Sequence, residues 1–204
     1  MRAVNKIYQL FIFIIVSGVM SCKQTTLSQE AYATYIDSDK SELVQSKEIG
    51  NFTIQCEYKT PEYIALKESN KDGHLVNQSK IDEYKNTFHF YMKLSSSKQT
   101  DFLKEGIENA EEYGHRLAYF TEHIQNNISL VLGTDTLPCS YSYFERNYGV
   151  QKVSTLLVGF DKINTDLQTM PSISFIYDDQ VLGVGPVIFQ YKSQNLKNIP
   201  QLDI

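Results

Sequence analysis

The stretch Phe52-Thr-Ile-Gln-Cys-Glu-Tyr58 alternates apolar and polar residues without interruption. Successive side chains of a β-strand point to opposite faces of its sheet, so Thr53, Gln55 and Glu57 fall together on one face. The apolar residues and Cys56 fall on the other face. This alternation predicts a strand with one side in a core and one side turned away from it.

The same alternation recurs along the chain. It is found in residues 86–94, 128–132, 139–143, 173–177 and 187–191. Residues 153–160 are apolar on both faces, which suits a central strand. About seven short strands separated by turn residues, with no βαβ rhythm, predict a mainly β protein with minor α content. We expect an antiparallel β-sandwich, with an immunoglobulin-like arrangement as one version of it.

One or two helices are expected in the first half of the chain. Thr60 can cap a short helix over residues 61–68, with Pro61 in its first turn. A second helix is expected within residues 97–125, because apolar residues recur there at three- and four-residue steps. Its stripe is Ala110, Tyr113, Leu117, Phe120 and Ile124. The alternative is that residues 115–121 already form a strand.

The N-terminal segment has a basic start and a short apolar run that ends in small residues and a cysteine. Arg2 and Lys6 precede the apolar residues 10–16. That run is too short to span about 30 Å of hydrocarbon as a permanent helix. Residues 19–22, Val-Met-Ser-Cys, resemble the lipobox of bacterial lipoproteins, in a chain of Bacteroidota-like composition. Met20 departs from the pattern, which prefers a small residue or a branched one.

The resemblance implies a signal peptide over residues 1–21 and a Cys22 that carries acyl chains such as palmitate. Two or three chains would hold the protein on a membrane that it does not cross. No acidic residues follow Cys22 directly, so an outer-membrane anchor facing the periplasm is expected rather than surface display. The alternative is an ordinary cleaved signal with an incidental cysteine.

The mature chain is predicted to be a tether followed by one domain. Residues 22–40 are polar without a strong apolar period and predict a flexible tether of very roughly 25 Å. Residues 41–204 form a single β-rich domain, in which residues 195–204 are a polar tail. Loss of Arg2 and Lys6 with the signal peptide changes the net charge from −5 to −7. A negative chain without a basic cluster is not expected to bind nucleic acid.

The sequence contains no familiar catalytic or metal-binding pattern. There is no Gly-x-Ser-x-Gly, no Cys-x-x-Cys and no histidine pair at the helical spacing of a zinc site, so neither a cofactor nor a metal ion is expected. Cys56 and Cys139 remain once Cys22 is assigned to lipid. An even remainder in an exported protein permits one disulfide, and the alternative is two buried, unpaired thiols.

The densest aromatic stretch, residues 141–149, is a candidate recognition surface. Tyrosines offer rigid amphipathic area, and arginine can pair with a carboxylate. The candidate residues are Tyr141, Tyr143, Arg146 and Tyr148. The alternative is a strand end in which Glu145 and Arg146 only stabilise the fold.

These observations favour a lipid-anchored protein of the cell envelope that acts by binding or as a scaffold for an envelope protein partner, rather than an enzyme. Two other classes stay open. One is an envelope hydrolase with an unfamiliar carboxylate site around Asp178 and Asp179. The other is an immunity or inhibitor lipoprotein that captures a secreted toxin.

Overall fold

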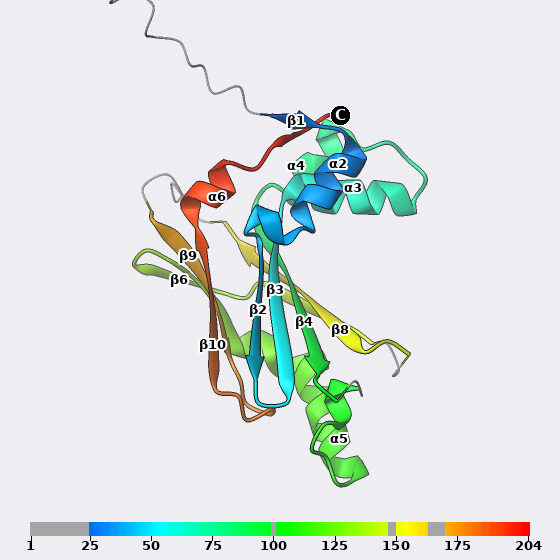
Figure 1. Ribbon diagram of the computed structural model, residues 1–204, viewed down its shortest axis with the longest axis vertical. Coiled ribbons are helices and arrows are strands. Elements are labelled where there is room, and N and C mark those ends of the chain that lie inside the picture. The colour runs from blue at the N-terminus through cyan, green and yellow to red at the C-terminus, as the bar shows by residue number, and fades with distance from the viewer. Residues whose placement is uncertain (1–24, 99–100, 147–149, 163–169) are drawn as a thin grey trace, which may run out of the picture.

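The computed structural model describes residues 25–98, 101–146, 150–162 and 170–204 (Figure 1). Its strands are β1 (Thr26–Leu27), β2 (Val44–Ile49), β3 (Phe52–Lys59), β4 (Thr87–Ser96), β5 (Ile128–Leu132), β6 (Asp135–Pro138), β7 (Tyr141–Glu145), β8 (Val153–Asp161), β9 (Ser172–Asp178), β10 (Pro186–Lys192) and β11 (Gln201–Leu202). Its helices are α2 (Gln29–Ile36), α3 (Pro61–Lys71), α4 (Gln78–Tyr84), α5 (Ala110–Ala118) and α6 (Ser193–Lys197). Four short helical turns complete the list: η1 (Asp39–Ser41), η2 (Phe102–Lys104), η3 (Tyr119–His123) and η4 (Ile124–Asn127).

Two antiparallel sheets form the body. The five-stranded sheet has the order β2-β3-β4-β8-β7, and the four-stranded sheet has the order β10-β9-β5-β6. A short parallel pair joins β1 to β11 at the end of the molecule where α2, α3 and α4 gather (Figure 1). No helix among the described residues is long and apolar enough to cross a membrane.

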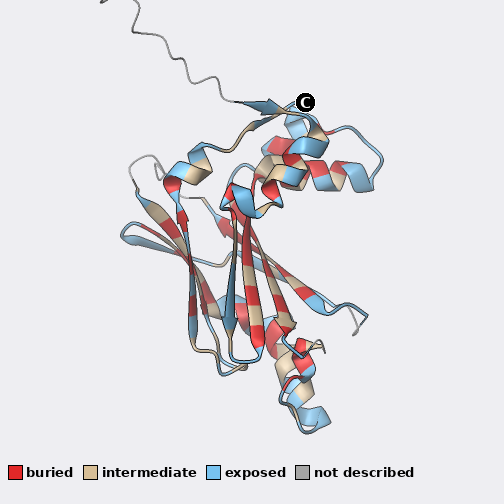
Figure 2. Cartoon of the chain, viewed as in Figure 1, coloured by how far each residue is buried: buried red, intermediate tan, exposed pale blue. Residues whose placement is uncertain are grey.

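The core lies between the inner faces of the two sheets, where aromatic rings from both sheets meet. The Phe90 ring centroid lies 5.1 Å from that of Phe175 and 5.6 Å from that of Tyr191. Figure 2 shows buried residues recurring along the strands. Burying one large apolar side chain contributes about 1.5–3 kcal/mol, so this layer is a main source of stability.

The predicted mainly β, antiparallel sandwich is confirmed. Its strand order is not that of an immunoglobulin domain. β2, β3 and β4 form a three-strand meander whose last strand, β4, pairs with the later strand β8. Constant-type immunoglobulin sheets contain no such meander, and in the variable type the meander C-C′-C″ pairs with the later strands through its first strand. The immunoglobulin-like version of the prediction is therefore wrong.

The two helix predictions hold, with different bounds. α3 begins at Pro61, and the Thr60 side chain caps it by accepting a hydrogen bond from the Tyr63 N–H at 3.1 Å. In the second predicted region the helix begins only at Ala110, after the Asn109 cap, and continues through η3 and η4. The alternative of a strand over residues 115–121 is wrong.

The tether prediction does not hold for residues 25–40, because this segment folds onto the body. α2 buries Tyr32 and Ile36, which are 1% and 0% exposed. The predicted polar tail is also folded. It forms α6 and β11, and the Gln201 N–H donates to the Thr25 carbonyl at 2.9 Å. Cys22 lies outside the described residues.

Candidate recognition surface

The outer face of the five-stranded sheet brings together residues from four strands. The strand register places them in two rows. The first row is Lys59, His89, Gly159 and Tyr141, and the second row is Glu57, Tyr91, Leu157 and Tyr143. Their neighbours along each strand point into the core, so these side chains point away from it.

A buried charge network supports one end of these rows. Lys59 is 0% exposed, and its Nζ lies 2.6 Å from Asp37 Oδ1 and 2.9 Å from Glu57 Oε2. Glu57 also pairs with Lys93, and the Tyr63 hydroxyl donates to Asp37 Oδ2 at 2.9 Å. Burial alone would raise the pKa of Asp37, but the hydrogen bond and charge of Lys59 outweigh it and lower that pKa. The network ties α2 and α3 to β3.

Gly159 allows Tyr141 to lie flat across the sheet. A Cβ at Gly159 would stand 1.9 Å from Tyr141 Cε1, so no side chain fits at this position while the ring stays. The Tyr141 hydroxyl lies 2.8 Å from His89 Nδ1, and His89 Nε2 lies 3.0 Å from the Tyr84 carbonyl oxygen. A carbonyl only accepts, so Nε2 donates to it. Burial lowers the pKa of His89 and favours the neutral ring, whose Nδ1 then accepts from Tyr141.

Exposed apolar side chains concentrate beside these rows. Seven large hydrophobic residues among the described part of the chain are exposed, and four of them lie on β7, on β8 or between the two strands. They are Tyr141 (42% exposed), Tyr143 (63%), Val150 (87%) and Val153 (40%). Contiguous exposed apolar surface is typical of interaction sites. We call the exposed Tyr141 and Tyr143, together with their half-buried row neighbours Tyr91 and Leu157, the recognition surface.

The structure brings together part of the predicted surface. Tyr141 and Tyr143 both lie on the outer face, because residues two positions apart on one strand point to the same side of the sheet. Arg146 lies past the end of β7, beside a small cavity of about 180 Å³ that Glu145 and Val153 also line. Tyr148 lies outside the described residues. Leu157 and Tyr91 were not predicted as members, because only the register of β4, β8 and β7 places them beside the tyrosines.

The two remaining cysteines are free thiols in the structure, so the disulfide alternative is wrong. Cys56 is buried on the inner face of β3, and Cys139 is partly buried just before β7. Burial raises the pKa of both thiols, that of Cys139 to about 11. Both thiols are therefore protonated at neutral pH. Because the thiolate is the nucleophilic form, neither cysteine is suited to act as a nucleophile.

Asp179, one of the two candidate hydrolase acids, holds its own loop in place. Its carboxylate accepts hydrogen bonds from the Tyr177 hydroxyl at 2.7 Å and from the backbone N–H groups of Leu182 and Val184 at 3.0 and 2.9 Å. Asp178 is exposed at the end of β9. Within the described ranges, no group of three or more His, Cys, Asp or Glu residues is placed to hold a metal ion.

Comparisons with known proteins do not assign this chain to a family. No family model matches the chain, and no curated protein matches it. Among solved structures, the chain is similar to a DUF4426 family protein from Pseudomonas aeruginosa PAO1. The two are 8% identical over 74% of this chain and 92% of that chain, with a TM-score of 0.36. At that score the two backbones differ too much for the likeness to bear on function.

Proposed function

We propose that this protein is a lipid-anchored binding protein of the bacterial cell envelope that docks an envelope protein through the recognition surface. The observation that supports docking is the exposure of Tyr141 and Tyr143 on one sheet face, beside the half-buried side chains of Tyr91 and Leu157. Tyrosine is enriched at protein interfaces because its ring offers apolar area and its hydroxyl a polar contact.

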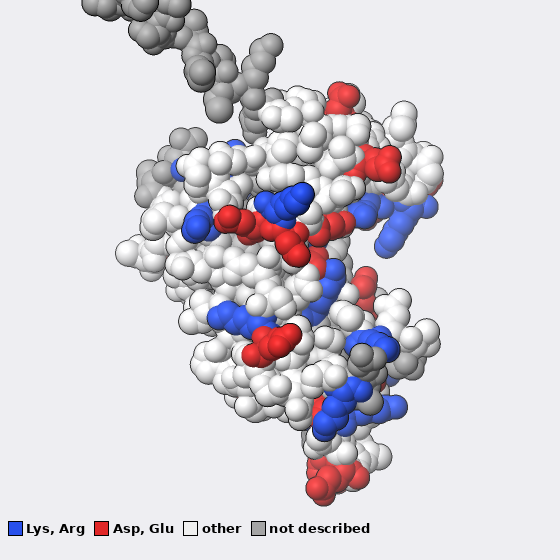
Figure 3. Space-filling model, viewed as in Figure 1, with Lys and Arg blue, Asp and Glu red and all other residues white. Residues whose placement is uncertain are grey.

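The chemistry of the surface indicates the kind of partner. Tyr143 and Leu157 are cross-strand neighbours, with Tyr91 next in the same row, and they form an apolar centre. Lys93 and Glu145, in the adjoining row, place opposite charges at its border. An apolar centre with a polar rim suits a protein that inserts an aliphatic or aromatic side chain. On the face shown in Figure 3, charges of both signs are interspersed.

The proposed anchor implies a body close to the membrane. β1 begins at Thr26, four residues after Cys22. Four residues span at most about 14 Å. If Cys22 carries acyl chains, the end of the molecule that bears β1 and β11 therefore lies next to the bilayer, closer than the predicted tether of roughly 25 Å would place it.

The anchor predicts how the protein is labelled and where it sediments. Cells fed a fatty-acid probe should yield a labelled protein that sediments with membranes. Cys22→Ser should lose the label and leave the membrane fraction, because no thiol remains to receive the diacylglycerol. Cys139→Ser, which removes a thiol of the folded body, should keep both properties. A Cys22→Ser protein that is still labelled would refute the anchor.

If the recognition surface docks a partner, truncation of one of its exposed rings should weaken binding of that partner. Tyr143→Ala should reduce the amount of co-purified partner from native membranes by about tenfold or more, the effect of removing an interface anchor. The free energy of unfolding should change by less than about 0.5 kcal/mol, since the side chain is 63% exposed. Quantitative mass spectrometry of the captured material measures the amount of partner, and urea denaturation measures the free energy of unfolding.

The matched control is Ile188→Ala, which truncates an exposed side chain, 46% accessible, on β10 of the other sheet. It should leave capture unchanged. Equal capture by Tyr143→Ala and the unaltered protein would exclude the recognition surface as the docking site. If the partner whose capture depends on Tyr143 is a secreted toxin, the binding protein is of the immunity class.

A further inference from the structure

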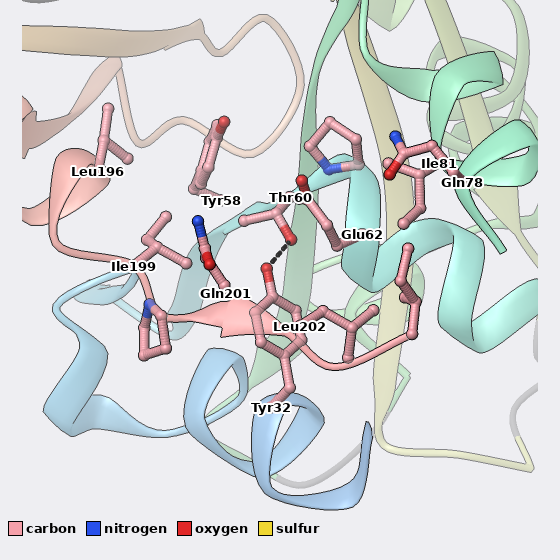
Figure 4. A pocket seen from close by; sticks show the side chains of 13 residues that line it. Tyr32, Tyr58, Thr60, Glu62, Gln78, Ile81, Leu196, Ile199, Gln201 and Leu202 are labelled. Atoms are coloured by element: carbon pink, nitrogen blue, oxygen red, sulfur yellow. Dashed lines mark hydrogen bonds between the residues drawn. The ribbon is translucent and has the colours of Figure 1, made fainter. Parts of the chain in front are cut away.

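A pocket of about 440 Å³ lies at the helical end of the molecule, on elements other than those of the recognition surface. α2, the end of β3, the first turns of α3 and α4, and the C-terminal segment with β11 enclose it (Figure 4). Its volume is within the range of about 300–1,000 Å³ typical of small-molecule sites. Leu196, Ile199 and Leu202 supply apolar wall from the C-terminal segment.

The polar side of the pocket is held in place by hydrogen bonds. The Tyr32 hydroxyl and Thr60 Oγ1 are 2.7 Å apart, as Figure 4 shows, and Thr60 Oγ1 also caps α3. Burial raises the pKa of Tyr32 and of Tyr58 above the ordinary value, so both phenols stay neutral. The pocket thus has fixed hydroxyl groups that add no charge.

Among the described residues that line the pocket, Glu62 has the only charged side chain. It is the second residue of α3, where the positive end of the helix dipole favours a carboxylate. It is half-buried and forms no salt bridge with a described residue. Lys162 interacts with it only at longer range and donates its hydrogen bond to the Lys85 carbonyl. A carboxylate partly withdrawn from water is stabilised by a cation that it can contact directly.

We propose that this pocket binds a small organic primary ammonium ion, with the ammonium on Glu62 and an apolar part against Leu196, Ile199 and Leu202. A primary ammonium fits because it donates up to three hydrogen bonds, and the pocket offers a carboxylate and hydroxyl oxygens to accept them. The ammonium belongs either to a free amine or to a lipid headgroup, since both present the same chemistry. The inference is independent of the proposed docking function.

The test is titration calorimetry on the purified full-length chain in non-ionic detergent at pH 7. Hexylamine should bind saturably with one site, and hexanol, of the same length without the charge, should bind about tenfold or more weakly. Glu62→Gln should weaken hexylamine binding by about tenfold and leave hexanol unchanged. Glu48→Gln, which removes an exposed carboxylate from β2, should leave both unchanged.

Two further ligands distinguish the sources of the ammonium. The first is dihexanoyl phosphatidylethanolamine, and the second is dihexanoyl phosphatidylcholine. If the ethanolamine lipid binds in a Glu62-dependent way and the choline lipid binds much more weakly, the ligand is a lipid headgroup. Glu62-dependent binding of hexylamine alone assigns a free amine. Equal affinity for hexylamine and hexanol, no saturable heat with hexylamine, or an unchanged Glu62→Gln variant overturns the proposal.

Discussion

Lys59→Met should lower the free energy of unfolding by about 3 kcal/mol, the largest effect expected of a single charged residue in this protein. Removing one partner from a buried ion pair typically costs about 3–5 kcal/mol, because the remaining charge is left buried without compensation. The lower end of this range applies here, because each remaining carboxylate still has a salt-bridge partner. Glu57 still pairs with Lys93, and Asp37 still pairs with Lys67 at 3.7 Å. Urea denaturation followed by circular dichroism measures the change.

The matched control breaks a salt bridge on the surface by the same substitution. Lys85 pairs with Asp82 at 3.3 Å, and both side chains are about half exposed. Lys85→Met should cost less than about 1 kcal/mol, the value for exposed pairs. Combining Lys59→Met with Glu57→Gln should recover part of the loss, because it removes a second buried charge. Equal effects of the two lysine substitutions would show that Lys59 is not held as the structure indicates.

The sequence was most informative where a local period decides which side chains are buried. In β3 and β4 the alternation correctly assigns side chains to the inner or the outer face of the sheet, although Glu57, Lys59 and His89 are buried on the outer face as well. In β7 the same pattern is ambiguous, because tyrosine and phenylalanine suit either face. The burial of Phe144 against the Phe102 and Phe120 rings turns Tyr141 and Tyr143 outward.

The features that sequence reasoning missed depend on contacts between distant parts of the chain. Tyr32 and Ile36 lie one helical turn apart and are the buried residues of α2, and one such pair in an eight-residue segment is too weak a periodic signal to predict the helix. The helix is stabilised by packing and by the Tyr32–Thr60 hydrogen bond, which spans 28 residues. β1 and β11 are each two residues long, and each needs the other end of the chain to form. The pocket around Glu62 depends on that same pairing.

Gly159→Ala should destabilise the protein by about 2 kcal/mol although it adds only a methyl group. The backbone of Gly159 is in an ordinary strand conformation, so strain in its φ angle plays no part. The loss has a steric cause: the new Cβ would stand 1.9 Å from Tyr141 Cε1, and the ring must leave. His89 Nδ1, in a residue only 4% exposed, then loses its hydrogen-bond donor, which costs about 1–3 kcal/mol.

A double-mutant cycle separates this explanation from a general intolerance of β8 to substitution. Tyr141→Ala alone should also destabilise, because it removes the same hydrogen bond. In the double variant Gly159→Ala/Tyr141→Ala, the methyl group occupies space that the ring has left. The double variant should therefore lose less free energy of unfolding than the sum of the losses of the two single variants, by about 1 kcal/mol or more. Chemical denaturation of the four proteins gives the coupling energy. Strictly additive losses would mean that Tyr141 does not lie across Gly159. In that case the geometry of the recognition surface would be wrong at its best-defined residue.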